Sequence, residues 1–348
     1  MKDRLIILFL VTALFSCQQK SKHREEIIFN RIEYIFNLKP LIAERFWKNF
    51  DDPSYDVPLI YYTDSSSYVA NPPEEFISYY KPELVFQNQQ INIYKTLKRY
   101  DDRPFHMETS FDIGDTTKGI DLSTPIMNCS SFEVTSKNIP NTSCTEYWVT
   151  MVIHEYFHGF QYKHKSYFDS TLKYSSIVSE DSLAQICSQN IWFNEKIKLE
   201  NAYLLKALKT TDSKETQNYI DSFIDVRSQR RAQTKDEMSF DISEYEKIYE
   251  TMEGTARYIE YKLQTTFSTK RPDEKLAATD TAYHSYKYFE DYKIENDPWL
   301  YTTSDKYFYA TGFNIVRLLD KLNIDYKPRL FKEGNLSLED LLITQQLH

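Results

Sequence analysis

The chain has 348 residues, of which 16% are aromatic and only 6 are glycine, so it can bury a large core and does not belong to the disordered class. Its formal net charge is −9, and its basic residues do not form long runs, which argues against a nucleic-acid-binding protein. We therefore expect a globular protein with one large domain or two, and no nucleic acid among its partners.

The N-terminus is typical of a bacterial targeting segment. Lys2 and Arg4 supply positive charge, and residues 5–15 form an apolar stretch that is too short to span a bilayer. The next residues, Leu-Phe-Ser-Cys ending at Cys17, resemble the lipobox of bacterial lipoproteins. The resemblance implies a signal peptide at 1–16, cleavage before Cys17 and attachment of lipid to that cysteine. The alternative is an ordinary signal peptide in which the cysteine is accidental.

The residues after the lipobox indicate where the protein is located. Gln18 stands where an aspartate retains lipoproteins at the inner membrane, so the resemblance implies a cell-envelope protein anchored in the outer membrane of a Gram-negative bacterium. Residues 17–26 are polar and charged, and we expect them to form a tether. In such an oxidising compartment Cys129 and Cys144 can pair or stay free, and Cys187 is the remaining thiol.

The first half of the mature chain alternates short apolar runs with turn signals, which predicts a β-sheet over about residues 55–135. A helix over 25–50, which Pro40 can break or kink, precedes the sheet. The predicted strands are Val57–Tyr62, Leu84–Phe86, Phe105–Ile113 and Gly119–Met127, with Ile91–Tyr100 as a strand or a helical turn. We expect 120–127 to be an edge strand that can pair with an extended peptide, and 128–143 to be a loop.

The second half, about residues 143–348, has the apolar spacing of helices. A Ser-x-x-Glu capping box at Ser143 and Glu146 predicts the start of an apolar helix that continues past His158. Further predicted helices are Asp181–Leu208, Lys214–Ala232, Ser243–Phe267, Asp305–Leu322 and Leu336–Leu347. A mixed sheet followed by a mostly helical half predicts an α+β fold for one domain over 27–348.

The apolar helix carries His154-Glu155-Tyr156-Phe157-His158, the HExxH pattern of zinc-dependent hydrolases. Histidines four residues apart lie on one helix face, so both imidazoles can reach one Zn²⁺, and Glu155 is placed to take a proton from water. Because the helix is apolar almost all round, we expect it to be buried, where such polar side chains are costly unless something pairs with them. The alternative is a core helix that carries two histidines by chance.

A third protein ligand has to come from elsewhere in the chain, and three residues compete for this role. His164 lies at the metzincin distance, but Gln161 stands where that pattern needs a glycine to end the helix. Glu180 lies in a stretch that resembles a helix N-terminus, where acidic residues are common. Glu253 is the third candidate, and its alternative role is a solvated helix glutamate paired with Arg257.

The surroundings of Glu253 resemble a known family. Residues 253–260, Glu-Gly-Thr-Ala-Arg-Tyr-Ile-Glu, are similar to the Glu-Gly-x-Ala-x-Tyr-x-Glu helix of the neutral zinc aminopeptidases, a type of gluzincin. Residues 309–312, Tyr-Ala-Thr-Gly, are similar to the Tyr-x-x-Gly element of the same family. The resemblance implies a zincin-like catalytic domain, with Glu253 as the third zinc ligand beside the two histidines and Tyr309 as a hydrogen-bond donor to the oxyanion.

The chain departs from this family pattern in two places. A predicted helical insertion over about 181–240 separates His158 from Glu253, where the family has a short connection. Residues 125–128, Pro-Ile-Met-Asn, stand where the family has an element whose glutamate holds a free amino terminus, and they contain no glutamate. Exopeptidase and endopeptidase activity are therefore both open.

These features predict a lipid-anchored zinc metallopeptidase that acts on a peptide or protein substrate. We expect Glu155 to act as the general base and Tyr309 to donate a hydrogen bond to the oxyanion. Two alternatives stay open. One is a non-catalytic binding protein on a zincin fold, which would have little reason to keep Glu155, and the other is a zinc amidase that cleaves non-peptide amides.

Overall fold

A computed structural model describes residues 2–96, 100, 102–111, 124–175, 179–239, 241–284, 300–301 and 305–344, without the side chains at 2–21, 175, 180 and 181. The chain divides into two compact units. The first unit is Met1–Leu41, Val57–Ile153 and Thr266–Glu290, and the second is Ile42–Asp56, His154–Thr265 and Asp291–His348. The fold is α+β, as predicted, because the sheet lies in the first unit and helices make up most of the second.

The first unit contains a six-stranded mixed sheet with the order β3-β4-β2-β1-β6-β5. Strand β1 pairs in parallel with β6, and the other neighbouring strands pair antiparallel. The strands are β1 (Leu59–Tyr62), β2 (Ser67–Ala70), β3 (Glu83–Gln87), β4 (Asn92–Thr96), β5 (Met107–Ser110) and β6 (Ile126–Ser130). Strands β1, β3 and β5 confirm predicted strands, and β4 confirms the strand alternative for 91–100. Strand β6 overlaps the strand predicted over 119–127 only at 126 and 127, and β2 was missed because its start looks like a serine-rich turn.

The position of β6 corrects one prediction. We expected residues 120–127 to form an edge strand, but β6 lies between β1 and β5 and is hydrogen-bonded to both. Residues 120–123 lie outside the described residues, so the correction concerns 126 and 127. Every residue of β1 and β6 is buried, which is typical of central strands, whereas β3 at one edge is partly exposed.

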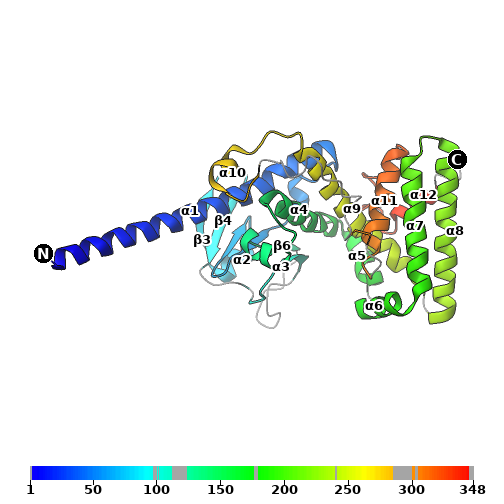
Figure 1. Cartoon of the computed structure of the whole chain (residues 1–348), viewed down its shortest axis with the longest axis horizontal. Coiled ribbons are helices and arrows are strands. Elements are labelled where there is room, and N and C mark those ends of the chain that lie inside the picture. Colours follow the sequence, from blue (N-terminus) through cyan, green and yellow to red (C-terminus); the bar gives the residue numbers. More distant parts are fainter. Residues whose placement is uncertain are drawn as a thin grey trace. The chain divides into compact units, whose positions relative to one another are not determined.

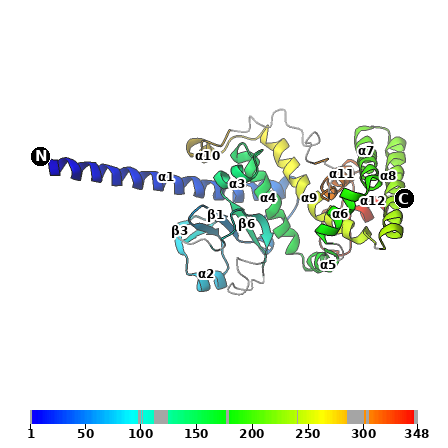
Figure 2. The same cartoon turned by 60° about the horizontal axis from the view of Figure 1, so that its bottom comes forward.

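Helices cover the sheet of the first unit. The later part of helix α1 (Lys2–Arg45) runs along the sheet in both Figure 1 and Figure 2, and its buried Arg31 donates to the hydroxyl of Tyr61 on β1. The same guanidinium forms two hydrogen bonds, of 2.7 and 3.0 Å, with Asp280, which follows α10 (Glu274–Thr279). Phe76 of α2 (Glu74–Tyr80) joins a core cluster with side chains of β1, β2 and β6.

Two local features of this part of the chain differ from what we expected. Helix α1 continues through Pro40 to Arg45 without a break, and its backbone also includes residues 17–26, whose role as a tether stays a prediction. The expected loop over 128–143 contains α3 (Phe132–Asn138), capped by Ser131, which accepts a hydrogen bond from the Val134 amide. None of the helices in the described part of the chain is both long enough and apolar enough to span a membrane.

The second unit is helical. Its helices are the later part of α4 (Thr145–Tyr162), α5 (Lys165–Ser175), α6 (Glu180–Gln189), α7 (Ile191–Lys209), α8 (Ser213–Met238), most of α9 (Ser243–Phe267), α11 (Phe308–Lys321) and α12 (Leu338–Thr344), with a short 3₁₀ turn at Pro53–Tyr55. Helices α7 and α8 form an antiparallel pair, and α7 also packs on α11 (Figure 1). The helix predicted over 181–208 is divided into α6 and α7 at Asn190, which has an extended backbone.

Helix α4 begins at Thr145, one residue after the start that the capping box predicts. The side chain of Glu146 accepts a hydrogen bond from the backbone amide of His284. The rest of α4 is buried as predicted, because its apolar side chains occupy most of the helix circumference.

Candidate metal centre

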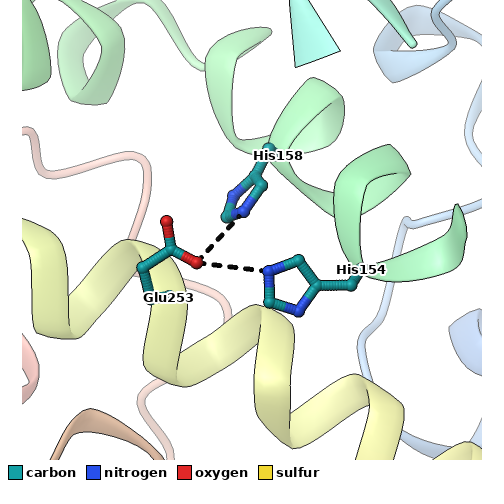
Figure 3. Close-up of side chains that lie close together, drawn as sticks. All are labelled: His154, His158 and Glu253. Atoms are coloured by element: carbon teal, nitrogen blue, oxygen red, sulfur yellow. Dashed lines mark hydrogen bonds and ion pairs between the residues drawn. The ribbon is translucent and has the colours of Figure 1, made fainter. Parts of the chain in front are cut away.

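Helices α4 and α9 bring the two histidines of HExxH together with Glu253. Figure 3 shows both imidazoles, from α4, facing one carboxylate oxygen of Glu253 on α9. That Oε2 lies 3.2 Å from Nε2 of His154 and 3.4 Å from Nε2 of His158. All three side chains are buried and belong to the second unit. Residues far apart in the sequence therefore form one compact group.

The geometry of this group fits a bound metal ion. One possible ligand atom from each residue lies within 4.8 Å of the others. Two ligands bound tetrahedrally at ~2.0–2.1 Å from a zinc ion lie about 3.3 Å apart, close to the two distances from Glu253 to the histidines. Two imidazoles and a carboxylate are ligands that catalytic zinc sites use. The group His154, His158 and Glu253 can therefore hold a metal ion.

The outer ring nitrogens of both histidines face polar side chains. Nδ1 of His158 lies 2.8 Å from Oε1 of Gln161, and the amide nitrogen of Gln161 donates to the carbonyl of Met252 and to Thr255 on α9. Nδ1 of His154 lies 3.4 Å from Oε1 of Glu260, an ion-pair distance without hydrogen-bond geometry. Contacts of this kind select the tautomer that leaves Nε2 free to bind a metal. Both imidazoles thus present Nε2 to the same point.

The charges of His158 and Glu253 shift each other's pKa values. Burial alone lowers the pKa of His158, but the Glu253 carboxylate outweighs burial and raises that pKa to about 9. Burial raises the pKa of Glu253, but the two imidazoles more than compensate and hold it well below its usual range. The carboxylate therefore stays ionised and attracts positive charge, which a proton on His158 or a metal cation can supply.

The two remaining predicted site residues border this group. Glu155 is half-buried on α4, and its pKa is raised by burial, against the effect of both imidazoles. Tyr309, half-buried in the first turn of α11, stacks against His154 with ring centroids 6.1 Å apart. Burial, followed by the charge of Glu253, holds the pKa of Tyr309 well above its usual range. Both residues therefore lie beside the ligand group, and both retain access to solvent.

Two glycines explain how α9 and α11 come so close. A Cβ atom on Gly254 would lie 2.3 Å from the backbone carbon of Gly312, and one on Gly312 would lie 2.2 Å from the carbonyl oxygen of Glu250. Such distances are far below van der Waals contact, so only glycine permits this backbone approach. Because Gly254 follows Glu253 and Gly312 lies one turn after Tyr309, the contact brings the helix segments that carry these two residues close together.

The other two candidates for the third ligand lie elsewhere. Nδ1 of His164 contacts the carbonyl of Phe160, and its ring stacks on Tyr55 at 4.3 Å. Glu180 is the first residue of α6, after the N-cap Ser179, and its side chain is outside the described part. Arg257, the expected partner of a solvated Glu253, instead pairs with Glu260, three residues further along α9.

The contacts of Gln161 were not predicted. Its glutamine side chain replaces the glycine of the metzincin pattern and links His158 to two groups on α9. Its position three residues after His158, on the same helix face, was the available signal. The three cysteines with described side chains, Cys129, Cys144 and Cys187, are free, so the possible pairing of the first two is not present.

Comparisons of the chain with known protein families, with curated proteins and with solved structures give no match in any of the three.

Proposed function

We propose that the protein is a zinc-dependent peptidase with a zincin-like catalytic domain of the gluzincin type. The observation that carries this proposal is the convergence of His154, His158 and Glu253, with Glu155 and Tyr309 beside them. A buried set of two histidines and one carboxylate, with a glutamate adjacent to one histidine, is the arrangement that metal-assisted hydrolysis of amides requires.

Each residue has a distinct task in this proposal. His154, His158 and Glu253 hold the ion, and Gln161 and Glu260 orient the imidazoles. When bound, zinc would act as a Lewis acid that makes water more acidic and polarises the scissile carbonyl. Glu155 accepts the proton of the attacking water and passes it to the leaving amine.

Tyr309 completes the set as a hydrogen-bond donor. A tyrosine hydroxyl keeps its proton at neutral pH, and burial raises the pKa of Tyr309 further, so this hydroxyl can donate a hydrogen bond to the oxyanion that forms on the substrate carbonyl. Its aromatic ring lies beside His154, so a substrate bound at the ion would be within reach of this donor. Tyr309 and Glu155 are the residues that would contact the substrate.

A metal assay coupled to a peptide-library cleavage screen tests this proposal. Zinc-loaded wild type should cleave peptides, and Glu155→Gln should keep zinc but lose turnover, because glutamine cannot accept the proton. Glu195→Gln, which alters an exposed pair with Lys198 on α7, is the matched control and should behave as wild type. Full activity in Glu155→Gln would contradict the mechanism.

The same screen separates the alternatives. A chain that binds zinc but cleaves only non-peptide amides, such as those of cell-wall material, would be a zinc amidase. A chain that binds neither zinc nor peptides would be a non-catalytic protein on a zincin fold. The half-buried Glu155 favours the peptidase, since a purely structural metal site has no use for a glutamate at that position.

We also propose that Cys17 carries lipid and anchors the protein in the cell envelope, as the lipobox-like Leu-Phe-Ser-Cys sequence indicates. Metabolic labelling with a clickable palmitate in a bacterial host should mark the wild type but not Cys17→Ala. Fractionation of the same cells should place the wild type in the outer membrane. Equal labelling of both proteins would contradict the proposal.

A further inference from the structure

A second group of buried charges lies in the second unit, around the helical insertion. Its basic members are Arg227, Arg230 and Arg231 of α8. Its acidic members are Glu200 of α7, Glu246 and Glu250 of α9, and Glu339 of α12. We call these residues the ionic cluster. Arg230 and Glu200 are completely inaccessible to solvent, and the least buried glutamate, Glu339, is 6% exposed.

The cluster connects the insertion to the helix that carries Glu253. Arg227 forms a bidentate pair with Glu250, at 2.8 and 2.6 Å. Arg230 donates to Glu246 at 2.5 Å and to Glu200 on α7. Paired guanidinium and carboxylate groups in a dry interior have fixed directions, so the insertion sets the position of α9.

The same two glutamates also hold α11. Glu246 accepts a hydrogen bond from the hydroxyl of Tyr307, and Glu250 accepts one from the hydroxyl of Thr311. These hydroxyls belong to the residues two positions before and two positions after Tyr309. The close contact between Gly312 and the carbonyl of Glu250 lies at the same level of the two helices.

We propose that the ionic cluster is a positioning device for Tyr309. Glu246 and Glu250, fixed by arginines of the insertion, hold Tyr307 and Thr311 and thereby keep Tyr309 beside His154. Tyr307 and Thr311 are then positioning residues, which act on the reaction only through Tyr309. The inference rests on the proposed function, because it assumes that Tyr309 donates to the oxyanion, and it gives the insertion between His158 and Glu253 a role in the reaction.

Removal of single hydroxyl groups tests this proposal with little risk to folding, because each glutamate keeps its arginine partners. Thr311→Val and Tyr307→Phe are the test variants, and Thr311→Ser restores a hydroxyl at the first position. The matched controls are Thr234→Val and Tyr167→Phe. Thr234 is a buried threonine of α8 whose hydroxyl bonds only to its own helix at Arg230, and Tyr167 is a buried tyrosine of α5 that contacts the carbonyl of Ile248.

Three quantities are measured on each full-length variant: kcat and KM with a cleaved peptide, the visible spectrum of the Co²⁺-substituted protein, and the thermal midpoint. We expect Thr311→Val and Tyr307→Phe to lower kcat about tenfold or more, with KM changed less than about twofold, because a displaced donor weakens only the transition state. Their Co²⁺ spectra should also shift, since the ring of Tyr309 stacks against His154, one of the three residues that would hold the ion.

The control variants separate a positioning role of the cluster from a purely structural one. Thr311→Ser should recover most of kcat, and the controls should keep the kcat and the Co²⁺ spectrum of wild type even where their midpoints fall. If Thr311→Val and Thr234→Val lose the same midpoint and keep the same kcat and spectrum, the cluster is only structural and the proposal is overturned. If wild type cleaves no peptide, the proposed function fails, and the Co²⁺ spectra alone decide the positioning role.

Discussion

Helix α9 carries two groups of buried carboxylates, and different cationic or ionisable side chains face the two groups. Glu246, Glu250, Glu253, Arg257 and Glu260 follow one another at spacings of four, three, four and three residues, so they form one stripe along the helix. In the first half of the stripe, arginines of α8 neutralise the carboxylates. In the second half, Glu253 faces two imidazoles, which become cationic only by binding a proton.

The difference shows which of the two regions can bind an ion. A buried carboxylate needs positive charge nearby, because its transfer from water is otherwise very costly. The ionic cluster supplies that charge with guanidinium groups. Their N–H groups already bond to the carboxylate oxygens, so these oxygens are not free to bind a cation. Around Glu253 the ring nitrogens that can bind a metal converge on the carboxylate instead, so a divalent cation satisfies all three groups at once.

The largest expected change in free energy comes from removing one arginine of the ionic cluster. Arg230→Met leaves Glu200 and Glu246 with less positive charge in a dry environment, and we expect a loss of about 3–5 kcal/mol of unfolding free energy. Urea denaturation of the purified variant measures this loss. Arg329→Met, which removes an exposed pair with Glu333, should cost less than about 1 kcal/mol. Equal losses in the two variants would show that the cluster does not support the fold.

Tyr309→Phe should have the next largest effect, and on activity rather than on folding. Loss of an oxyanion donor typically lowers kcat by ~10²–10³. Zinc content should stay at the wild-type value, because Tyr309 is not a ligand in this account. Metal analysis and steady-state kinetics on the same sample check both statements. An unchanged kcat would remove Tyr309 from the mechanism.

A smaller effect, on zinc affinity, is expected from replacing Gln161, which contacts the outer ring nitrogen of His158. Gln161→Met removes the oxygen that fixes His158 and should weaken zinc binding about 10- to 100-fold, as is usual when such a partner is lost. Competition with a chromophoric chelator measures the affinity. Gln161→Glu retains an acceptor at the same position and should bind zinc more tightly than Gln161→Met. A reversed order would contradict the assigned role of Gln161.

The smallest expected effect is on the pH dependence of stability, and it comes from Glu339, the least buried glutamate of the ionic cluster. Burial raises the pKa of Glu339, but Arg227 and Arg231 outweigh it and lower that pKa to about 2. A carboxylate whose pKa is lowered on folding stabilises the fold above its unfolded pKa of ~4.3, and this contribution disappears as the pH falls toward 2. Glu339→Gln should therefore be less stable than wild type at pH 7, with a gap that narrows below about pH 4. A gap independent of pH would contradict this.

The two acidic regions also differ in how far the sequence predicts them. HExxH and the segments around Glu253 and Tyr309 have short spacings fixed by helix geometry and by reaction chemistry, so their residues were nominated correctly as neighbours. The ionic cluster was not foreseen, because the arginines of α8 look like the solvated face of a charged helix. These charged residues are buried only because α7, α8, α9 and α12 pack together. The sequence of any one of these helices does not reveal that packing.

The same reason accounts for the errors in the fold. Strand β2 and the helices α2, α3 and α10 are only four to seven residues long, too short for a clear apolar period, so tertiary contacts decide their structure. Pro40 lies inside α1, although proline disfavours helix interiors, and the helix around it is strongly buried. Among the long, regularly spaced elements, α9 and α11 were predicted to within three residues, and α8 was predicted with an end six residues too early.

The most direct test of the central claim is a metal titration of the purified chain. Wild type, stripped with a chelator and dialysed against zinc, should contain about one ion per chain by elemental analysis. Glu253→Gln should lose most of this zinc at the same free concentration, whereas Glu250→Gln, the same change one turn away in the ionic cluster, should retain it. Zinc absent from wild type, or present equally in both variants, would contradict the assignment of His154, His158 and Glu253 as a metal centre.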